Sequence, residues 1–309
     1  GRYSTKPRFT FVQDRITNTF RAMTRTSKNI LIITMVLVGG LCATPQAVAQ
    51  TVLDGAYIKE NTKTKRVVPY THIREADVMW ARRVWRRIDL REKMNHPLYY
   101  PTDAINDRKS LFDVIRQGLM VDGSITAYDA GPFLDDDEFK KALLPGDLQE
   151  MFSRLDTSYT ESLTTGDMEM VVQEINLESR DIKLYDMKED WIFDKQRSIM
   201  DIRIIGIAPL RENIGEDGES RGFAPMFWLY YPECRYVFAN WEAFNRENDA
   251  ERRSYEDIFW KRQFSSYITK WSNVYDRGIN EYKQGLDALL EGEEIKSALF
   301  EFEHDLWNF

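Results

Sequence analysis

The sequence has 309 residues, of which 43% are hydrophobic and 30% charged, as expected for a globular chain with a sizeable core. This composition excludes an intrinsically disordered protein. The net charge at pH 7 is −8, and it becomes −14 once residues 1–49 are set aside, because that segment holds seven basic residues and one acidic residue. A chain this acidic is not expected to bind nucleic acid.

Residues 1–49 have the pattern of an export signal. A basic stretch that begins at Met23 precedes the apolar run Ile30–Leu41, whose 12 residues fall short of the roughly 20 that span a bilayer. Ala47 and Ala49 then match the small-x-small rule for cleavage before Gln50. We therefore predict a secretory signal that is removed, with the residues before Met23 as an upstream extension. The alternative is an uncleaved anchor.

The first segment after this signal is polar and Lys-rich. Residues 50–72 show no apolar period, so we predict an extended arm that is a linker or that becomes ordered on a partner. The remainder, 73–309, is predicted to form a single α+β domain. Its first part, 73–160, is expected to be mainly helical, and 161–309 is expected to hold the sheet and the C-terminal helices.

A helix is predicted over Ile73–Asn95, because large apolar side chains recur there at helical spacing. They are Ile73, Ala76, Trp80, Val84 and Ile88. The same segment is crowded with arginine and tryptophan, which are enriched in the energetically dominant residues of protein interfaces. The candidate partner interface consists of Trp80, Arg82, Arg83, Trp85, Arg86 and Arg87. The alternative is a solvated basic face that the protein's own acidic residues neutralise.

Further helices are predicted over Ser110–Gly118, capped by Ser110, and over Asp147–Leu155, with a strand at Ser124–Ala130 between them. Strand patterns then follow at Met168–Ile175, Ile182–Tyr185, Trp191–Phe193, Ser198–Ile207 and Phe227–Tyr231, and Arg235–Phe238 could pair back against the last. The Gly- and Glu-rich segment Asn213–Gly222 is expected to be a hairpin loop. The predicted fold class is therefore α+β, with a mainly antiparallel sheet over about 168–238 and helices at both ends.

The C-terminal part is predicted to be helical. An aromatic-rich helix is expected from Tyr255 to Trp271. The final helix carries an amphipathic stripe, in which apolar residues step by four, three, four and three. They are Ile295, Leu299, Phe302, Leu306 and Phe309.

No motif for catalysis or cofactor binding is found in the sequence. It lacks the glycine-rich nucleotide loops, and its three histidines do not have metal-ligand spacing. The acidic run Asp135–Glu138 lacks the alternating ligands of a calcium loop. Cys234, the one cysteine outside the predicted signal, is expected to be a small buried hydrophobe. We therefore expect no catalytic, metal or cofactor-binding residues.

Six blocks of sequence, in order, resemble the GldN/PorN family. They are Val84–Pro101, Glu189–Ser198, Ile204–Pro209, Phe227–Arg235, Ser254–Arg262 and Phe302–Trp307. The resemblance runs from about Leu53 to Phe309.

This resemblance implies a non-enzymatic, structural subunit of the type IX secretion and gliding motility apparatus of Bacteroidota. It implies a location in the periplasm, at the inner face of the outer membrane. The expected partners are a GldK/PorK-type lipoprotein, with which the chain forms a ring, and the periplasmic domain of the GldM/PorM motor protein, with no membrane span in this chain. The competing hypotheses are a periplasmic hydrolase, which needs a deep polar pocket, and a ligand-binding protein, which needs a closed apolar cavity.

Overall fold

The computed structural model of the chain describes residues 65–105, 108–161, 168–214, 219–248 and 250–306. The chain divides into two units, residues 1–60 and 61–309, and every described residue belongs to the second. The predicted signal, with Ala47, Ala49 and Gln50, and most of the predicted arm lie outside the described residues.

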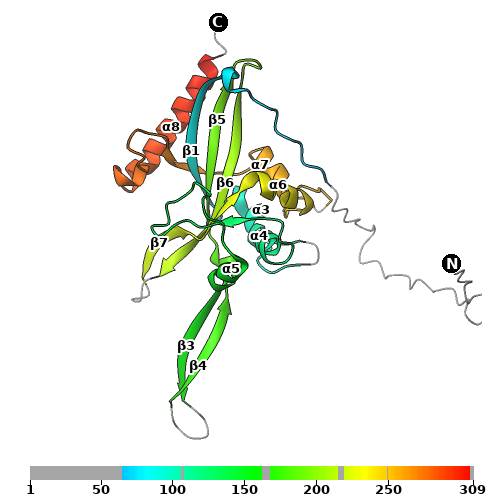
Figure 1. Cartoon of the computed structure of the whole chain (residues 1–309), viewed down its shortest axis with the longest axis vertical. Helices are drawn as coiled ribbons and strands as arrows, with labels where there is room; N and C mark the ends of the chain where they lie inside the picture. Colours follow the sequence, from blue (N-terminus) through cyan, green and yellow to red (C-terminus); the bar gives the residue numbers. More distant parts are fainter. Residues whose placement is uncertain (1–64, 106–107, 162–167, 215–218, 249, 307–309) are drawn as a thin grey trace, which may run out of the picture. The chain divides into compact units, whose positions relative to one another are not determined.

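The fold is built around one antiparallel sheet of seven strands. Its strand order is β2-β8-β6-β5-β1-β9, and β7 also pairs with β6. The strands are β1 (Val78–Asp89), β2 (Ala127–Tyr128), β5 (Leu184–Asp194), β6 (Ile199–Ile214), β7 (Ser220–Pro225), β8 (Trp228–Tyr230) and β9 (Tyr267–Trp271). The long strands β1, β5 and β6 form its centre (Figure 1).

The helix predicted over Ile73–Asn95 is wrong, because this segment contains β1. Its spacing was ambiguous: Trp80, Val84 and Ile88 are four residues apart, and four residues return to the same side of a strand as well as of a helix. Burial in β1 alternates residue by residue, with Val84 and Ile88 fully buried. Arginine is tolerated here because β5 supplies partners for it, as described below.

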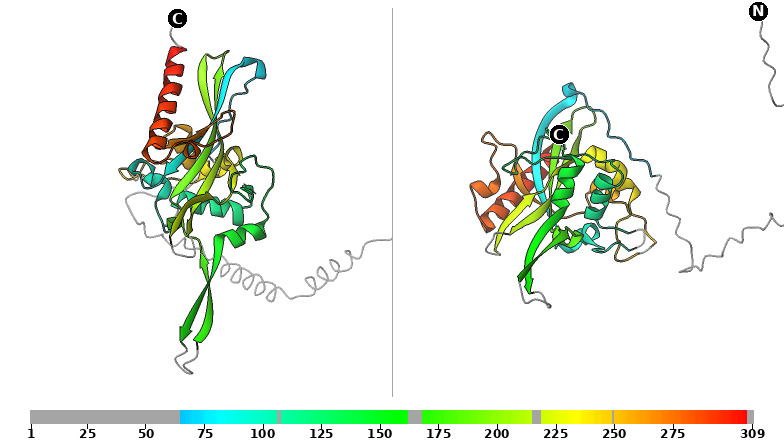
Figure 2. Two further views of the ribbon diagram at one scale, coloured as in Figure 1. Left: turned by 90° about the vertical axis from the view of Figure 1, so that its left-hand side faces the viewer. Right: turned by 60° about the horizontal axis from the view of Figure 1, so that its bottom comes forward.

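One face of β1 and β5 packs against two hydrophobic clusters. The larger cluster joins Ile88 and Tyr185 to the helices α4 (Leu111–Met120), α5 (Pro145–Phe152), α6 (Tyr231–Asn240) and α7 (Tyr255–Trp260). The second joins Val84 and Trp191 to the buried side of α8 (Leu286–Asp305). Figures 1 and 2 accordingly show α8 alongside the long strands and the other helices gathered elsewhere on the sheet.

The remaining elements are short or separate. The helix α3 (His96–Tyr99) and the 3-10 turns Glu75–Asp77, Lys93–Asn95, Ser179–Asp181 and Ile279–Glu281 lie in the connections. The strands β3 (Ser153–Glu161) and β4 (Met168–Asn176) pair only with each other among the described strands, as a two-stranded sheet beyond α5 (Figure 1).

Two further predictions needed correction. Arg235–Phe238 belongs to α6 and not to a strand, because Pro232 in the first turn favours a helix start. The predicted helix Tyr255–Trp271 ends at Trp260, and Tyr267–Trp271 is the strand β9 beside β1. Arg262, with φ of 52°, lies in the turn that ends α7.

The fold class is nevertheless α+β with a mainly antiparallel sheet, as predicted. However, β1, β2 and β9 extend the sheet beyond 168–238, and β4, at the start of that range, pairs with β3 in a separate sheet. The predicted helices at Ser110–Gly118 and Asp147–Leu155 correspond to α4 and α5, and the final helix to α8. Ser110 caps α4 by accepting a hydrogen bond from the Asp113 amide.

Candidate assembly surfaces

The outer face of β1 carries a ladder of ion pairs with β5. The register places Arg83 opposite Asp190 and Arg87 opposite Asp186. Each guanidinium donates two hydrogen bonds to its aspartate, at 2.7 and 3.0 Å for Arg83 and at 2.6 and 2.8 Å for Arg87. Burial lowers the pKa of Arg87, but the bonds to Asp186 outweigh it and the net shift is upward. Both arginines are thus neutralised by the protein's own acids.

Trp85 lies on the same outer face, between the two ion pairs. Its indole Nε1 donates to the Asp137 carboxylate, and the ammonium of Lys270 lies 4.6 Å from the ring centroid. Lys188, opposite Trp85 in the register, donates a hydrogen bond of 2.8 Å to the Asp137 backbone carbonyl. The segment around Asp137 therefore covers this part of the sheet.

The other three candidate residues lie on the opposite face of β1, toward α8 and β9. The Trp80 ring packs on Phe302 of α8 with 4.7 Å between centroids, and the Arg82 guanidinium lies 4.2 Å from the Trp271 ring. Arg86 is 7% exposed and hydrogen bonds to Ser266. The six residues predicted to form one interface are therefore divided between two faces of a strand, and five of them pack largely within the protein. The Arg83 side chain is 44% exposed and the Arg87 side chain 22%, so Arg83 is the more accessible of the two arginines in the ladder.

The end of the arm docks on α6 and α7 of its own chain. The ammonium of Lys65 contacts Ser254 and Asp257 at the start of α7. The Tyr70 ring stacks on Trp260 at 5.4 Å, and the Arg235 guanidinium lies 4.2 Å from the Tyr70 ring centroid. Burial raises the pKa of the Tyr70 hydroxyl. Sequence analysis missed this contact, because none of these residues is near the arm in the sequence.

Beneath the arm lies a buried ion pair. Arg235 of α6, 3% exposed, donates to Glu256 of α7 at 2.7 Å. The same Nη2 donates to the backbone carbonyl of Val68 in the arm at 2.7 Å. The arm therefore completes the hydrogen bonding of a buried guanidinium, a group that is costly to leave unsatisfied.

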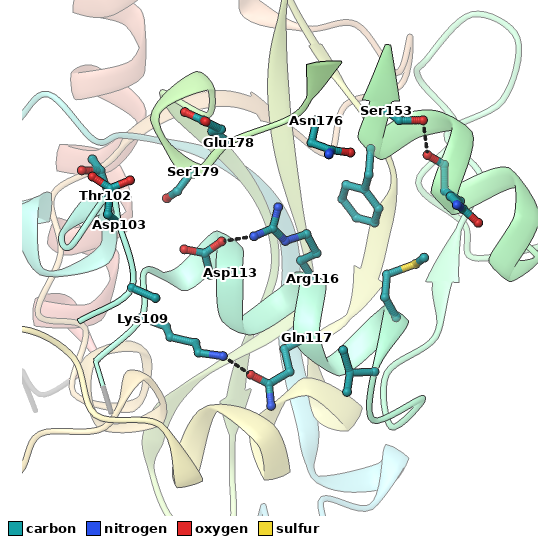
Figure 3. Close-up of a pocket in the computed structure, with 15 residues that line it drawn as sticks. Thr102, Asp103, Lys109, Asp113, Arg116, Gln117, Ser153, Asn176, Glu178 and Ser179 are labelled. Atoms are coloured by element: carbon teal, nitrogen blue, oxygen red, sulfur yellow. Dashed lines mark hydrogen bonds and ion pairs between the residues drawn. The ribbon is translucent and has the colours of Figure 1, made fainter. Parts of the chain in front are cut away.

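A polar cleft of about 890 Å³ lies beside α4 (Figure 3). Several of its polar groups bind one another: Arg116 pairs with Asp113 at 2.8 Å, and Lys109 donates to the side-chain amide oxygen of Gln117 at 2.6 Å. Asp113 also accepts a hydrogen bond from Ser110. This arrangement anchors the start of α4, and it does not set a nucleophile beside a free base.

The described surface also exposes large apolar side chains around α8. On the helix these are Leu286, Leu289, Leu290 and Phe300, which are 70%, 48%, 58% and 68% exposed. Val274 in the preceding loop is 97% exposed. Exposed apolar groups that gather on one element are typical of surfaces that bind other proteins.

Metal and membrane signals are absent from the part of the chain that the structure describes. No group of His, Cys, Asp or Glu there is arranged to hold a metal ion. None of the helices in the described ranges combines the length and the hydropathy of a membrane span. Cys234 is fully buried, and burial raises the pKa of its thiol, so it is a small core residue as predicted.

The fold and these surfaces define an α+β protein whose polar clusters stabilise its own structure. The chain belongs to the GldN family, described as gliding motility associated proteins, whose family model matches residues 73–308. This confirms the resemblance found in the sequence and makes the chain a component of the gliding motility and type IX secretion apparatus. It matches none of the curated proteins with which it was compared.

Proposed function

We propose that this protein is a non-enzymatic structural subunit of the secretion and gliding apparatus. It acts in the periplasm, at the inner face of the outer membrane, after removal of the signal before Gln50. It assembles into a ring with a GldK/PorK-type lipoprotein and contacts the periplasmic domain of a GldM/PorM-type motor protein. Force from the motor passes through the ring to the secretion channel.

The observation that best supports this proposal is the exposed surface of α8. This helix carries seven acidic residues and one lysine, and it exposes Leu286, Leu290 and Phe300 between them. Burial of such side chains in an interface contributes about 25 cal/mol per Å² of apolar area. A subunit of a ring needs surfaces of this kind, because it binds neighbours on more than one side.

Co-purification tests the proposal. The chain from Gln50 to Phe309 is mixed with the mature lipoprotein and, separately, with the periplasmic domain of the motor protein, and each mixture is separated by size-exclusion chromatography with light scattering. Co-elution in assemblies much larger than a binary complex supports the ring. Separate elution of all three proteins at micromolar concentration would refute it.

The candidate interface on β1 stays part of this proposal, with Arg83 as the residue to test. A charge reversal at Arg87 would place a negative charge beside half-buried Asp186 and would destabilise the fold. Loss of assembly in that variant would therefore not distinguish an interface role from misfolding. Exchange of Arg83 and Asp190 keeps their ion pair and moves the charges between strands. If the exchange weakens assembly while the stability of the protein is unchanged, the result supports a role of Arg83 in the interface. Unchanged assembly would show that Arg83 is not part of the interface.

The arm is a second candidate contact with a neighbour. Deletion of Thr51–Thr64 leaves the described contacts of Lys65 and Tyr70 in place, so folding should be preserved. Loss of rings in this variant supports a role of residues 51–64 in assembly. Rings of normal size would show that the arm serves only its own chain.

The competing hypothesis of a hydrolase predicts activity in the polar cleft beside α4. Replacement of Asp113 by Asn is the matching test. If the protein is a structural subunit, Asp113→Asn should weaken assembly only to the extent that it lowers the stability of the fold.

A further inference from the structure

A second cleft, of about 500 Å³, lies between α8 and the sheet. Arg86 of β1, Trp191 of β5, and Arg262, Phe264 and Ser266 from the segment between α7 and β9 line one side. On the other side are residues of α8, among them Glu293, Lys296 and Phe300.

Arg86 is a buried cation that lacks a carboxylate partner. It is 7% exposed, its Nε donates to Ser266 Oγ at 2.8 Å, and its Nη2 donates to the Ser266 carbonyl at 3.2 Å. Both partners are neutral, and no carboxylate of the described residues lies within ion-pair distance of it. Burial of the guanidinium lowers the pKa of Arg86. A buried charge without an opposite charge is destabilising, so this group is poised to gain from binding an anion.

The nearby acid cannot serve Arg86 because it is already engaged. Glu189, fully buried, accepts hydrogen bonds from Arg262 at 2.7 and 3.1 Å and from the Trp191 indole at 3.1 Å. On α8, Glu293 is paired with Lys296 at 3.2 Å. Two arginines and one glutamate thus leave one uncompensated positive charge at the base of the cleft.

The rim limits what can bind there. Glu301 and Glu303 of α8 line the cleft, and Phe300 stands 68% exposed between its polar neighbours. The negative charges of Glu301 and Glu303 repel a dianion such as phosphate. They favour a ligand in which a single carboxylate is flanked by basic groups. Phe264, 8% exposed, and Phe300 offer apolar contact to the stem of an inserted side chain.

We propose that this cleft is a docking site for an acidic side chain of a partner protein, in a segment where the acid is flanked by basic and apolar residues. The carboxylate binds Arg86, the flanking bases meet Glu301 and Glu303, and the apolar residue packs on Phe300. This inference rests on the proposed assembly role, since it supplies one contact through which the subunit holds a neighbour.

A peptide titration tests the site directly. The probe is the capped tetrapeptide acetyl-Lys-Glu-Phe-Lys-amide, and its control has Gln in place of Glu. The full mature chain is labelled with ¹⁵N-arginine, and Arg86→Lys assigns the Arg86 Nε resonance. We expect saturable movement of that resonance with the Glu peptide, binding at least tenfold weaker with the Gln peptide, and weakening as salt is raised. Equal binding of both peptides, or an unmoved Arg86 resonance, would overturn the proposal.

Matched variants separate the site from general effects on folding. Phe300→Ala removes an exposed side chain at the rim of the cleft and should weaken binding of the Glu peptide at least threefold. Phe133→Ala removes a side chain that is 86% exposed outside the cleft and should leave binding unchanged. Equal weakening by both would contradict the inference. Because the peptide does not depend on the ring partners, its failure alongside successful co-purification refutes the cleft alone. Peptide binding without co-purification would instead refute the proposed function.

Discussion

Arg87 of β1 and Asp186 of β5 are joined by two parallel hydrogen bonds, although 99 residues separate them in the chain. Arg83 and Asp190, one repeat further along the same pair of strands, adopt the same arrangement in a more exposed setting. The two pairs differ mainly in burial, so together they measure how burial changes the value of an ion pair in this sheet.

Replacement of Arg87 by Met is expected to destabilise the protein by about 2 kcal/mol, because it leaves the half-buried carboxylate of Asp186 without its partner. The measurement is the urea midpoint at pH 7. Arg83→Met is the matched control and should cost less than about 1 kcal/mol, since exposed ion pairs contribute little. A cost for Arg83→Met equal to or above that of Arg87→Met would contradict this account of the ladder.

Gly292 fixes the distance between α8 and β9. A Cβ built on Gly292 would lie 2.8 Å from the backbone carbonyl oxygen of Ile268, and backbone cannot move aside as a flexible side chain does. We expect Gly292→Ala to destabilise the protein by about 1–3 kcal/mol and to loosen α8 from the sheet. Urea unfolding and hydrogen exchange of the α8 amides measure the two effects.

Gly146 in α5 provides the control for that substitution, because a Cβ there meets nothing within 4 Å. Gly146→Ala should leave stability unchanged or raise it by roughly 0.5–1 kcal/mol, since alanine favours the helix. If Gly292→Ala were as harmless as Gly146→Ala, the close packing of α8 on β9 would be wrong.

Local patterns in the sequence were sufficient for several elements. Ser110 before an apolar periodic run correctly placed the start of α4, and the strand pattern at Ser198–Ile207 correctly placed the first part of β6. In α8 the residues Ile295 and Leu299 of the predicted stripe are buried. In each case the signal lies within one element, and neighbouring residues are enough to read it.

The misassigned elements depend on contacts with distant residues. A spacing of four in β1 fits both helix and strand, and the choice is made by β5, about 100 residues away, which supplies Asp186 and Asp190. Burial of Arg86 and docking of Tyr70 likewise depend on Ser266 and Trp260. The arginines and tryptophans of the candidate interface make strong contacts within the chain, and the sequence alone did not reveal these internal partners.

Acid is expected to weaken the fold through Asp89. The Arg91 guanidinium donates to this carboxylate at 2.6 Å and holds its pKa below the usual range. A lowered pKa in the folded state means that the contribution to stability is complete above the unfolded-state pKa of about 3.9 and is lost as the pH falls through the folded-state value. Asp89→Asn should therefore be less stable than the parent at pH 7 and should approach it below about pH 3.

Urea midpoints measured from pH 7 to pH 2 test this pH dependence. Asp122→Asn, at an exposed position, makes the same change of charge and controls for the overall charge of the protein. A difference between Asp89→Asn and the parent that stays constant over the whole range would show that the Asp89–Arg91 pair contributes nothing to acid sensitivity.

Tyr70 is expected to hold the end of the arm on the body of the protein. Its ring contacts Trp260 and Arg235, and an aromatic pair and a cation–π contact are each worth roughly 0.5–1.5 kcal/mol. Tyr70→Ala should therefore release residues 65–71 locally, and every 1.4 kcal/mol lost should increase the open population about tenfold. Trypsin cleavage after Lys65 and Arg66 should accelerate accordingly, with a smaller change in the global urea midpoint.

Tyr236→Ala is the control for this substitution, because it removes a tyrosine that is 67% exposed on α6 and should leave the cleavage rate unchanged. Cleavage of Tyr70→Ala at the parental rate would mean that the backbone contacts of Val68 and Thr71 with Arg235 and Arg203 are sufficient to hold the arm.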